Sequence, residues 1–418
     1  MELPVCLALE GNYIIASGWA VFPFHAGNVS LSKGNIMTKR IEEALKNKNV
    51  PTPCLIIDLE RVRDNYRTFS EEMDGMAVYY AVKANPHEEI LNVLAQEGCN
   101  FDCASLAEID MVLKAGATPD RISFGSTIKK ASDIAHAFER GVRLFAFDAE
   151  EELHKLSVHA PGSSVFCRIL TNLDGAGAAW PLSRKFGCDD HMAISLLLLA
   201  AELGLLPRGV SFHVGSQQTD MAPWQTAIWQ AAWIFAEVEK HGIHMDLLNL
   251  GGGFPTDFGD DLSPTVDKYA DSLMQFMENS FPERSMNLIV EPGRALVGDA
   301  GIIVSEVVLV ARKSEVDSHR WVYLDVGKFH GLAETEDEAI RYPIVSVDVT
   351  GEMSPVILAG PTCDSVDTMY EKNLVPLPNN LAAGHKLWIY ATGAYTSTYS
   401  SVGFNGFPPL SVRLIEDL

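Results

Sequence analysis

Over roughly its first 290 residues, the chain alternates short apolar runs with longer segments of helical period. Segments such as "HEEILNVLAQEG" and "SLAEIDMVLKAG" repeat apolar residues every three or four positions and end in glycine, as helix C-termini often do. Eight strands that are each followed by a helix predict a (β/α)8 barrel of the TIM type. The apolar runs that predict these strands are 77–82, 101–104, 121–125, 144–148, 164–170, 209–215, 247–251 and 287–292.

After Pro292 the pattern becomes strands separated by turns. Runs such as "GIIVSEVVLVARK", "RWVYLDVG" and "KLWIYATG" have no strong helical segment between them, which predicts a separate all-β domain of sandwich or barrel type. The run "PCLIIDL" near residue 54 predicts a further strand that is compatible with either domain. We divide the chain into an extension (1–36), a segment whose strand joins the β domain (37–58), a barrel (59–295) and a C-terminal β domain (296–418).

Composition limits the kinds of partner. The formal net charge of −23 argues against nucleic acid and suits a cationic small molecule. No apolar run reaches the ~18 residues of a membrane span, and residues 1–36 lack the basic start of a signal peptide, so we interpret them as an extension. Seven cysteines without a CxxC pair indicate reduced thiols and a cytoplasmic protein. No metal-ligand spacing is present, so we expect no metal.

Polar residues follow the predicted barrel strands at the end where this fold carries its chemistry. Taken singly, each has an ordinary structural interpretation: Lys83 in "YYAVKANP" as a solvated lysine, His213 as a core histidine, and "GGG" as a tight turn. The tryptophans at 224, 229 and 233 are predicted to be core residues. In chain order the strand ends give Lys83, Asp102 with Ser105 and Glu108, Arg168, His213 with Ser216, "NLGGGFP" and "VEPGRA".

Together these residues form a set that pyridoxal phosphate requires. A lysine can bond the cofactor's aldehyde, and the backbone N–H groups of a glycine run can hold its phosphate with help from Ser216 and Arg294. The carboxylate of Glu291 can keep the pyridine nitrogen protonated.

The order and spacing of the motifs resemble those of the fold-type III pyridoxal-phosphate decarboxylases, and within them the ornithine decarboxylase branch with its bacterial ornithine/lysine members. The resemblance runs from about Thr52 to the C-terminus. It rests on "YYAVKANP", "FDCAS", "WPLSRKFG", "SFHVGS", "NLGGGFP", "VEPGRA", "YLDVGKF", "GLAETEDEAIRYPI", "GPTCDSVD" and "GAYTSTYSSVGFNGFPP".

The resemblance implies a role for each matching residue around the cofactor. Lys83 would hold pyridoxal phosphate covalently, Glu291 would pair with its ring nitrogen, and His213 would stack on its ring. Asp102, Glu108 and Arg168 would line the cofactor pocket. The residues implied to bind the phosphate are Ser216, Gly252, Gly253, Arg294 and Tyr395.

The resemblance also implies a head-to-tail homodimer with shared active sites. Cys363 and Asp364 would reach into the partner's barrel, where Cys363 is a suitable acid to return a proton to the substrate Cα. Asp325 and Asp364 would receive the distal amine of the substrate. No nucleic acid or membrane partner is implied.

Two carboxylates would attract an ammonium group and repel a second carboxylate, so we expect a basic amino acid rather than diaminopimelate. The resemblance implies decarboxylation of L-ornithine to putrescine and CO2 in polyamine biosynthesis, with lysine to cadaverine as a further reaction. One methylene separates these substrates, which is worth only about 1–3 kcal/mol in a pocket. His330 stands where a small residue is expected, so it leaves the size of the pocket open.

Three alternatives stay open at this point. The resemblance also fits a lysine, arginine or diaminopimelate decarboxylase. An amino-acid racemase is a further alternative, because it shares the barrel and its lysine. A non-catalytic regulatory relative is a different class, and such proteins are expected to lose cofactor or proton-donor residues. Against this last alternative stand Lys83, Glu291, Arg294, Cys363 and Tyr395.

Overall fold

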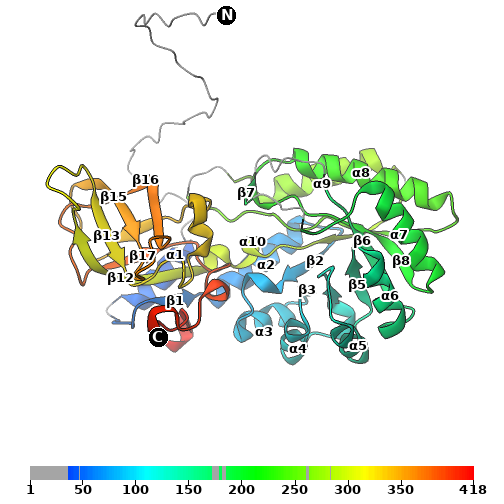
Figure 1. Ribbon diagram of the computed structural model, residues 1–418, viewed down its shortest axis with the longest axis horizontal. Coiled ribbons are helices and arrows are strands. Elements are labelled where there is room, and N and C mark those ends of the chain that lie inside the picture. Colours follow the sequence, from blue (N-terminus) through cyan, green and yellow to red (C-terminus); the bar gives the residue numbers. More distant parts are fainter. Residues whose placement is uncertain (1–35, 47, 172–177, 181–184, 260–262, 283) are drawn as a thin grey trace, which may run out of the picture.

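The chain folds into two units that lie end to end along the long axis of the molecule (Figure 1). The computed structural model describes residues 36–46, 48–171, 178–180, 185–259, 263–282 and 284–418. All but the last residue of the predicted extension, and part of the motif "WPLSRKFG", lie outside these ranges. Among the helices of the described chain, none has the length and apolar character needed to cross a membrane.

The first unit is a closed barrel of eight parallel strands, which confirms the predicted (β/α)8 architecture. Each predicted run extends into the turn that follows its strand. The strands are β2 (Met76–Ala81), β3 (Asn100–Cys103), β4 (Ile122–Phe124), β5 (Leu144–Phe147), β6 (Ser164–Arg168), β8 (Leu206–Ser211), β10 (Leu247–Asn249) and β11 (Asn287–Val290).

Helices surround this barrel and bury their apolar stripes against the outer face of the strands. A smaller cluster that includes Tyr79, Phe166 and Ile289 fills the interior, since its members come from opposite walls. The helices are α2 (Leu59–Glu72), α3 (Glu88–Gln96), α4 (Leu106–Lys114), α5 (Ala131–Glu139), α6 (Glu150–His159), α7 (Asp190–Glu202), α8 (Ala222–Glu239), α9 (Val266–Ser280) and α10 (Arg294–Val297), while α1 (Ile36–Leu45) lies beside the second unit.

The tryptophans of α8 do not all belong to the core, so the prediction is wrong for two of them. Trp224 is fully buried and donates from Nε1 to the Leu250 carbonyl at 3.1 Å. Trp229 and Trp233 are 54% and 41% exposed. At 3.6 residues per turn they lie roughly 140° and 180° around the helix from Trp224. They therefore share the outer face of α8.

The second unit is an eight-stranded mixed sheet with the order β14-β17-β12-β13-β15-β16, in which β1 pairs with β12 and β18. The segment of β1 thus lies in this sheet, antiparallel to β12 and parallel to β18. The strands are β1 (Cys54–Ile57), β12 (Gly301–Ala311), β13 (Arg320–Leu324), β14 (Ile344–Ser346), β15 (Met353–Ala359), β16 (Thr368–Pro378), β17 (Lys386–Ile389) and β18 (Ser411–Leu414).

Strand β16 was not predicted from the sequence. Its residues "TMYEKNLVPLP" include two prolines and lack a clean alternation, which argues against a central strand. β16 pairs only with β15, at the end of the sheet order. A proline is tolerated at such an edge because its missing N–H would face no neighbouring strand.

Smaller elements complete the two units. A two-stranded sheet joins β7 (Ala178–Trp180) to β9 (Ser216–Gln218) beside the barrel. The short 3-10 turns are η1 (Val82–Ala84), η2 (Pro119–Arg121), η3 (Gly298–Ala300), η4 (Ala333–Glu338), η5 (Ser397–Tyr399), η6 (Phe404–Gly406) and η7 (Ile415–Asp417).

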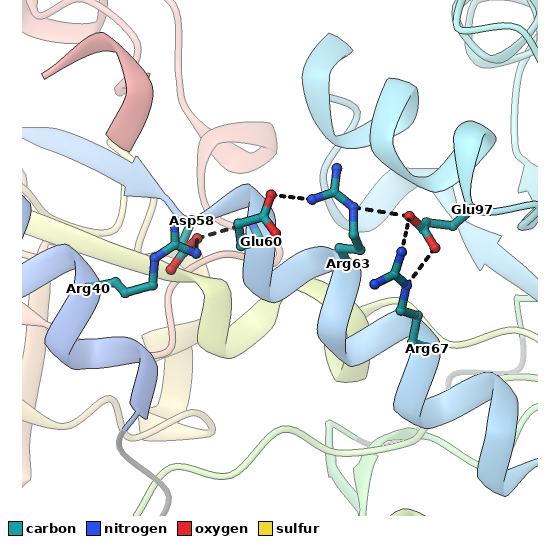
Figure 2. Close-up of polar contacts among 6 residues, drawn as sticks. All are labelled: Arg40, Asp58, Glu60, Arg63, Arg67 and Glu97. Carbon is teal, nitrogen blue, oxygen red and sulfur yellow. Dashed lines mark hydrogen bonds and ion pairs between the residues drawn. The ribbon is translucent and has the colours of Figure 1, made fainter.

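Ion pairs fasten α2 to both of its neighbours (Figure 2). Asp58, fully buried, caps α2 by accepting from Glu60 N at 3.1 Å and also accepts from Arg40 of α1 at 2.9 Å. Burial raises the pKa of Asp58, and Arg40 partly offsets that effect. Further along α2, Arg67 binds Glu97 through two hydrogen bonds of 2.8 and 2.9 Å. The helix that enters the barrel is therefore fixed to the second unit at one end.

The turn after β2 is tied directly to the second unit. Asn85 is 1% exposed and donates from Nδ2 to the Gly393 carbonyl at 2.8 Å. The Tyr80 hydroxyl donates to the Asn85 carbonyl at 2.9 Å, and Tyr395 N donates to the Ala84 carbonyl at the same distance. These bonds hold the 82–85 turn against the loop that carries Tyr395.

Asn85→Ala should lower the free energy of unfolding by about 1–3 kcal/mol, because it leaves the buried Gly393 carbonyl without its donor. Urea denaturation of the purified protein measures this loss. Asn380→Ala is the matched control: its exposed side chain donates to the Thr350 carbonyl at 3.3 Å, and we expect a change within about 0.5 kcal/mol. Equal losses in the two variants would contradict the importance of the Asn85 contact.

Candidate active site

Lys83 lies in η1, immediately after β2, at the carboxyl end of the barrel. Its side chain keeps accessible surface, although neighbouring residues enclose it enough for desolvation to oppose its charge. Tyr395, Asp102 and Glu291 outweigh that desolvation and raise the pKa of Lys83 above its ordinary value. The three residues belong to the second unit and to two different barrel strand ends, so the fold brings them to one lysine.

Asp102, on β3, is a buried acid at the same end of the barrel. It is 6% exposed, and its Oδ1 has no hydrogen-bond partner. Burial, followed by the nearby Glu291, raises its pKa well above the ordinary value, while Lys83 acts in the opposite direction. A Cβ at Gly125 would stand 1.8 Å from Oδ1, so only glycine leaves room for the Asp102 carboxyl group.

Arg168 and His213 complete the ring of groups around Lys83. Burial lowers the pKa of Arg168, with Glu291 and Asp102 opposing this effect. Burial also lowers the pKa of His213 well below its ordinary value, and the positive charges of Arg168 and Lys83 lower it further. The imidazole is therefore neutral near pH 7, and it presents a flat uncharged ring beside the lysine.

Glu108 is held by the start of α4. Its Oε2 accepts from Ala104 N at 2.6 Å, and its own N donates to the Ser105 hydroxyl oxygen at 3.2 Å. Burial raises the pKa of Glu108, and the Ala104 hydrogen bond and the charge of Lys83 counter this. The carboxylate thus accepts a hydrogen bond at the start of α4 and also interacts with the charge of Lys83.

The glycine run stands between the strand ends that carry His213 and Glu291. A Cβ at Gly252 would lie 2.5 Å from the Glu291 carbonyl oxygen and 3.5 Å from the His213 ring. At Gly253, which has a φ of +109°, a Cβ would lie 2.4 Å from the Gly215 carbonyl oxygen. Glycine is therefore required at both positions by this close approach of backbone segments.

Arg294 opens α10 beside this run and is 2% exposed. Its Nη2 donates to Ser216 Oγ at 3.3 Å and to Glu334 Oε1 at 2.6 Å, and its guanidinium lies 4.9 Å from the centre of the Tyr395 ring. Its Nε and Nη1 have no partner. The sequence did not predict Glu334 as a partner, since it is one of several acids in "GLAETEDEAIRYPI" from the second unit.

Asn249 is a further residue that the sequence reasoning missed. It is fully buried at the end of β10, and its Nδ2 donates to Glu291 Oε1 at 2.5 Å. The available signal was an amide within the apolar run "LLNL" directly before the glycines. A buried amide requires partners, so this position could have been singled out.

Cys363 and Asp364 lie apart from the Lys83 cluster, on an exposed loop of the second unit. Cys363 N donates to Asn405 Oδ1 at 3.0 Å. Beneath them the buried Asp367 accepts from Thr362 N at 3.0 Å and from Lys328 N at 2.8 Å. The loop is thus anchored from below while its thiol and carboxylate face outward.

Asp325 and His330 make their contacts with other residues of the second unit. Asp325 Oδ1 accepts from the Ser305 hydroxyl at 2.7 Å and from Glu306 N at 2.9 Å, so its carboxylate is engaged with β12. His330 is 2% exposed, contacts the Phe407 ring edge-on at 5.0 Å, and neither ring nitrogen has a partner. Burial lowers its pKa, so we infer a packed neutral ring.

These residues fit pyridoxal phosphate. The unpartnered Nε and Nη1 of Arg294 are donors that a phosphate would satisfy, and they lie beside Ser216 and a glycine run that no Cβ obstructs. The neutral His213 ring and the Glu291 carboxylate suit the face and the nitrogen of a pyridine ring. Among the described residues, no group of three or more His, Cys, Asp or Glu side chains could hold a metal ion.

Comparison with known proteins agrees with this site. Residues 59–298 match the family model for the pyridoxal binding domain of pyridoxal-dependent decarboxylases. The chain is 31% identical to a lysine/ornithine decarboxylase of Selenomonas ruminantium, over 88% of this chain and 94% of that protein. It is 32% identical to an ornithine decarboxylase of Caenorhabditis elegans, over 84% and 85% of the two chains.

A solved structure is also similar. SrLDC in complex with pyridoxal phosphate and cadaverine superposes with a TM-score of 0.80 and 30% identity, covering 91% of this chain and 94% of that chain. The fold, the site and these matches define a pyridoxal-phosphate enzyme of the barrel type. The chain belongs to the pyridoxal-dependent decarboxylase family and is an amino-acid decarboxylase.

The neutral His213 predicts a pH dependence. In the unfolded chain its ring binds a proton near its ordinary pKa of about 6.5, but the folded protein resists that proton, so stability falls below this pH. Between about pH 7.5 and 5.5, cofactor-free wild-type protein should therefore lose more stability than His213→Gln, by up to about 1.4 kcal/mol.

Urea denaturation at the two pH values measures this difference. The control is His241→Gln, at an exposed position after α8, which should follow the wild-type pH dependence. If His213→Gln loses as much stability on acidification as wild type, then the folded ring binds its proton normally and the assignment of a neutral His213 is wrong.

Proposed function

We propose that this protein decarboxylates L-ornithine to putrescine and CO2. The observation that carries the proposal is the cluster in which Lys83 lies among Asp102, Glu291 and Tyr395, beside the glycine run and the unpartnered nitrogens of Arg294. The relatives named lysine/ornithine and ornithine decarboxylase support a basic amino acid as substrate. The net charge of −23 favours a cationic substrate as well.

When bound, pyridoxal phosphate supplies an acceptor for the electron pair that remains on Cα after CO2 leaves. Lys83 would hold the cofactor's aldehyde carbon, and Glu291 would stabilise a proton on its ring nitrogen. Arg294, Ser216, Tyr395 and the amides of the glycine run would hold the phosphate. His213 would cover one face of the ring and exclude water from it.

The proton that returns to Cα requires an acid, and a cysteine thiol is a suitable one. Cys363 and Asp364 are exposed on a loop of the second unit that Asp367 anchors. We propose that two copies pair head to tail, so that the partner's Cys363 protonates Cα and the partner's Asp364 receives the distal ammonium group. The carboxylate of Asp325 already accepts from Ser305 and Glu306, so it would act indirectly, by holding the end of β13 against β12.

Lysine and arginine are the alternative substrates, since each carries a distal cation that the same carboxylate would accept. His330 is 2% exposed and packs against Phe407, so its ring gives no reason to exclude the longer side chains. A racemase is disfavoured because the chain belongs to the decarboxylase family.

Offered ornithine, lysine, arginine and diaminopimelate in turn, the protein supplemented with pyridoxal phosphate should release CO2 fastest from ornithine, with putrescine as the amine. Released CO2 and identified amines measure this.

Lys83→Ala should lose the visible absorbance of covalently bound cofactor and at least about 10²-fold in kcat. Preference for another amino acid would correct the substrate, and a Lys83→Ala protein that keeps the absorbance would refute the role of the lysine.

Mixing Lys83→Ala with Cys363→Ala protein should restore up to about a quarter of wild-type activity. In a random mixture, half of the dimers are hybrids, and each hybrid has one intact site out of two. Subunit exchange, confirmed by native mass spectrometry of size-tagged copies, is the control. No recovery despite exchange would show that each site is built within one chain.

A further inference from the structure

Asn249 links two parts of the site that are otherwise separate in the chain. Its Nδ2 donates to Glu291 Oε1 at 2.5 Å, and its Oδ1 accepts from Gly251 N at 2.9 Å. Glu291 N in turn donates to the Gly251 carbonyl at 2.8 Å. These three bonds form a closed circuit around one fully buried amide.

The direction of the circuit follows from which atoms can donate. The Gly251 N–H can only donate, so the amide oxygen of Asn249 must face it. The amide nitrogen must then face Glu291, whose Oε1 serves as the acceptor. Oε1 is thereby committed to Asn249, and the carboxylate is held with Oε2 as the oxygen left for a ring nitrogen.

We propose that Asn249 is a positioning residue that sets the Glu291 carboxylate and the glycine run in one arrangement. The same side chain would then position the groups that bind the ring nitrogen and the phosphate of pyridoxal phosphate. This inference rests on the proposed function, because the arrangement matters only if Glu291 and the glycine run meet the same cofactor.

Replacing the Asn249 amide with a carboxyl group affects its hydrogen bonds to Gly251 and Glu291 differently. Asn249→Asp keeps an acceptor for Gly251 N but offers Glu291 a donor only while a proton is shared between the two carboxyl groups. Carboxyl groups this close cannot both ionise easily, so the shared proton is held at low pH and leaves as the pH rises. Asn249→Ala removes both bonds at every pH.

The test measures pyridoxal phosphate affinity and the absorbance of the bound cofactor from about pH 6 to pH 9, on protein first freed of cofactor. The ratio of the Asn249→Asp Kd to the wild-type Kd should be near one at the acidic end and rise tenfold or more at the alkaline end. Asn249→Ala should bind at least tenfold more weakly throughout. The ratio of the Asn249→Asp kcat to the wild-type kcat should fall over the same range as the pH rises.

Asn65→Asp is the matched control. Asn65 of α2 donates from Nδ2 to Asp299 Oδ1 at 2.7 Å and to the Leu296 carbonyl at 3.1 Å, so the same exchange creates a carboxyl pair outside the site. It should lose stability as the pH rises, with no change in the cofactor Kd ratio. A purely structural effect would change the cofactor Kd ratio in the same way for both variants.

A Kd ratio for Asn249→Asp that stays flat with pH, or an Asn249→Ala protein that binds as wild type does, would overturn the proposal. So would failure of Asn249→Asp to fold at any pH, since its protonated form can make both bonds. In each case wild-type binding and CO2 release test the proposed function separately. Wild-type protein that neither binds pyridoxal phosphate nor releases CO2 would refute that function instead.

Discussion

Mutual compensation of charge at the mouth of the barrel is the constraint on which the rest of the structure depends. Desolvation acts on Asp102, Lys83 and Arg168 at one end of the strands, beside Glu291, and each charge would be costly there without the others. Glu291 is among the main electrostatic influences on the pKa values of Asp102, Lys83 and Arg168. The site is therefore a single coupled unit, in which removing one charge alters the protonation of its neighbours.

The two units depend on each other through the same region. The Arg294–Glu334 pair joins the barrel to the second sheet at 2.6 Å, and both partners are buried. Glu334 raises the pKa of Arg294 in spite of the desolvation, and Asn85 and Tyr395 add hydrogen bonds across the same boundary. An all-β unit attached to a barrel thus acts as a wall of the barrel's own site.

The sequence predicted what is local or periodic. Apolar runs gave the eight barrel strands, and strand ends gave Lys83, Asp102, Arg168, His213 and Glu291, because a parallel barrel carries all strand ends to one rim. The sequence failed where one residue's role depends on a distant partner. Glu334 carries no pattern of its own, and the amide of Asn249 in an apolar run indicates a buried partner without saying which one. The engagement of Asp325 by Ser305 and Glu306 follows from how β12 and β13 pair.

The anchored loop around Cys363 has a consequence for how tightly another surface can bind to it. Asp367 fills the space that a Cβ would take at Gly327 and at Gly360, with its Oδ1 2.1 and 2.3 Å from those positions, so the backbone closes onto this carboxylate. The loop loses its conformational entropy when the chain folds. A molecule that docks on its outward face has less ordering to oppose it, so affinity can come from a small contact area.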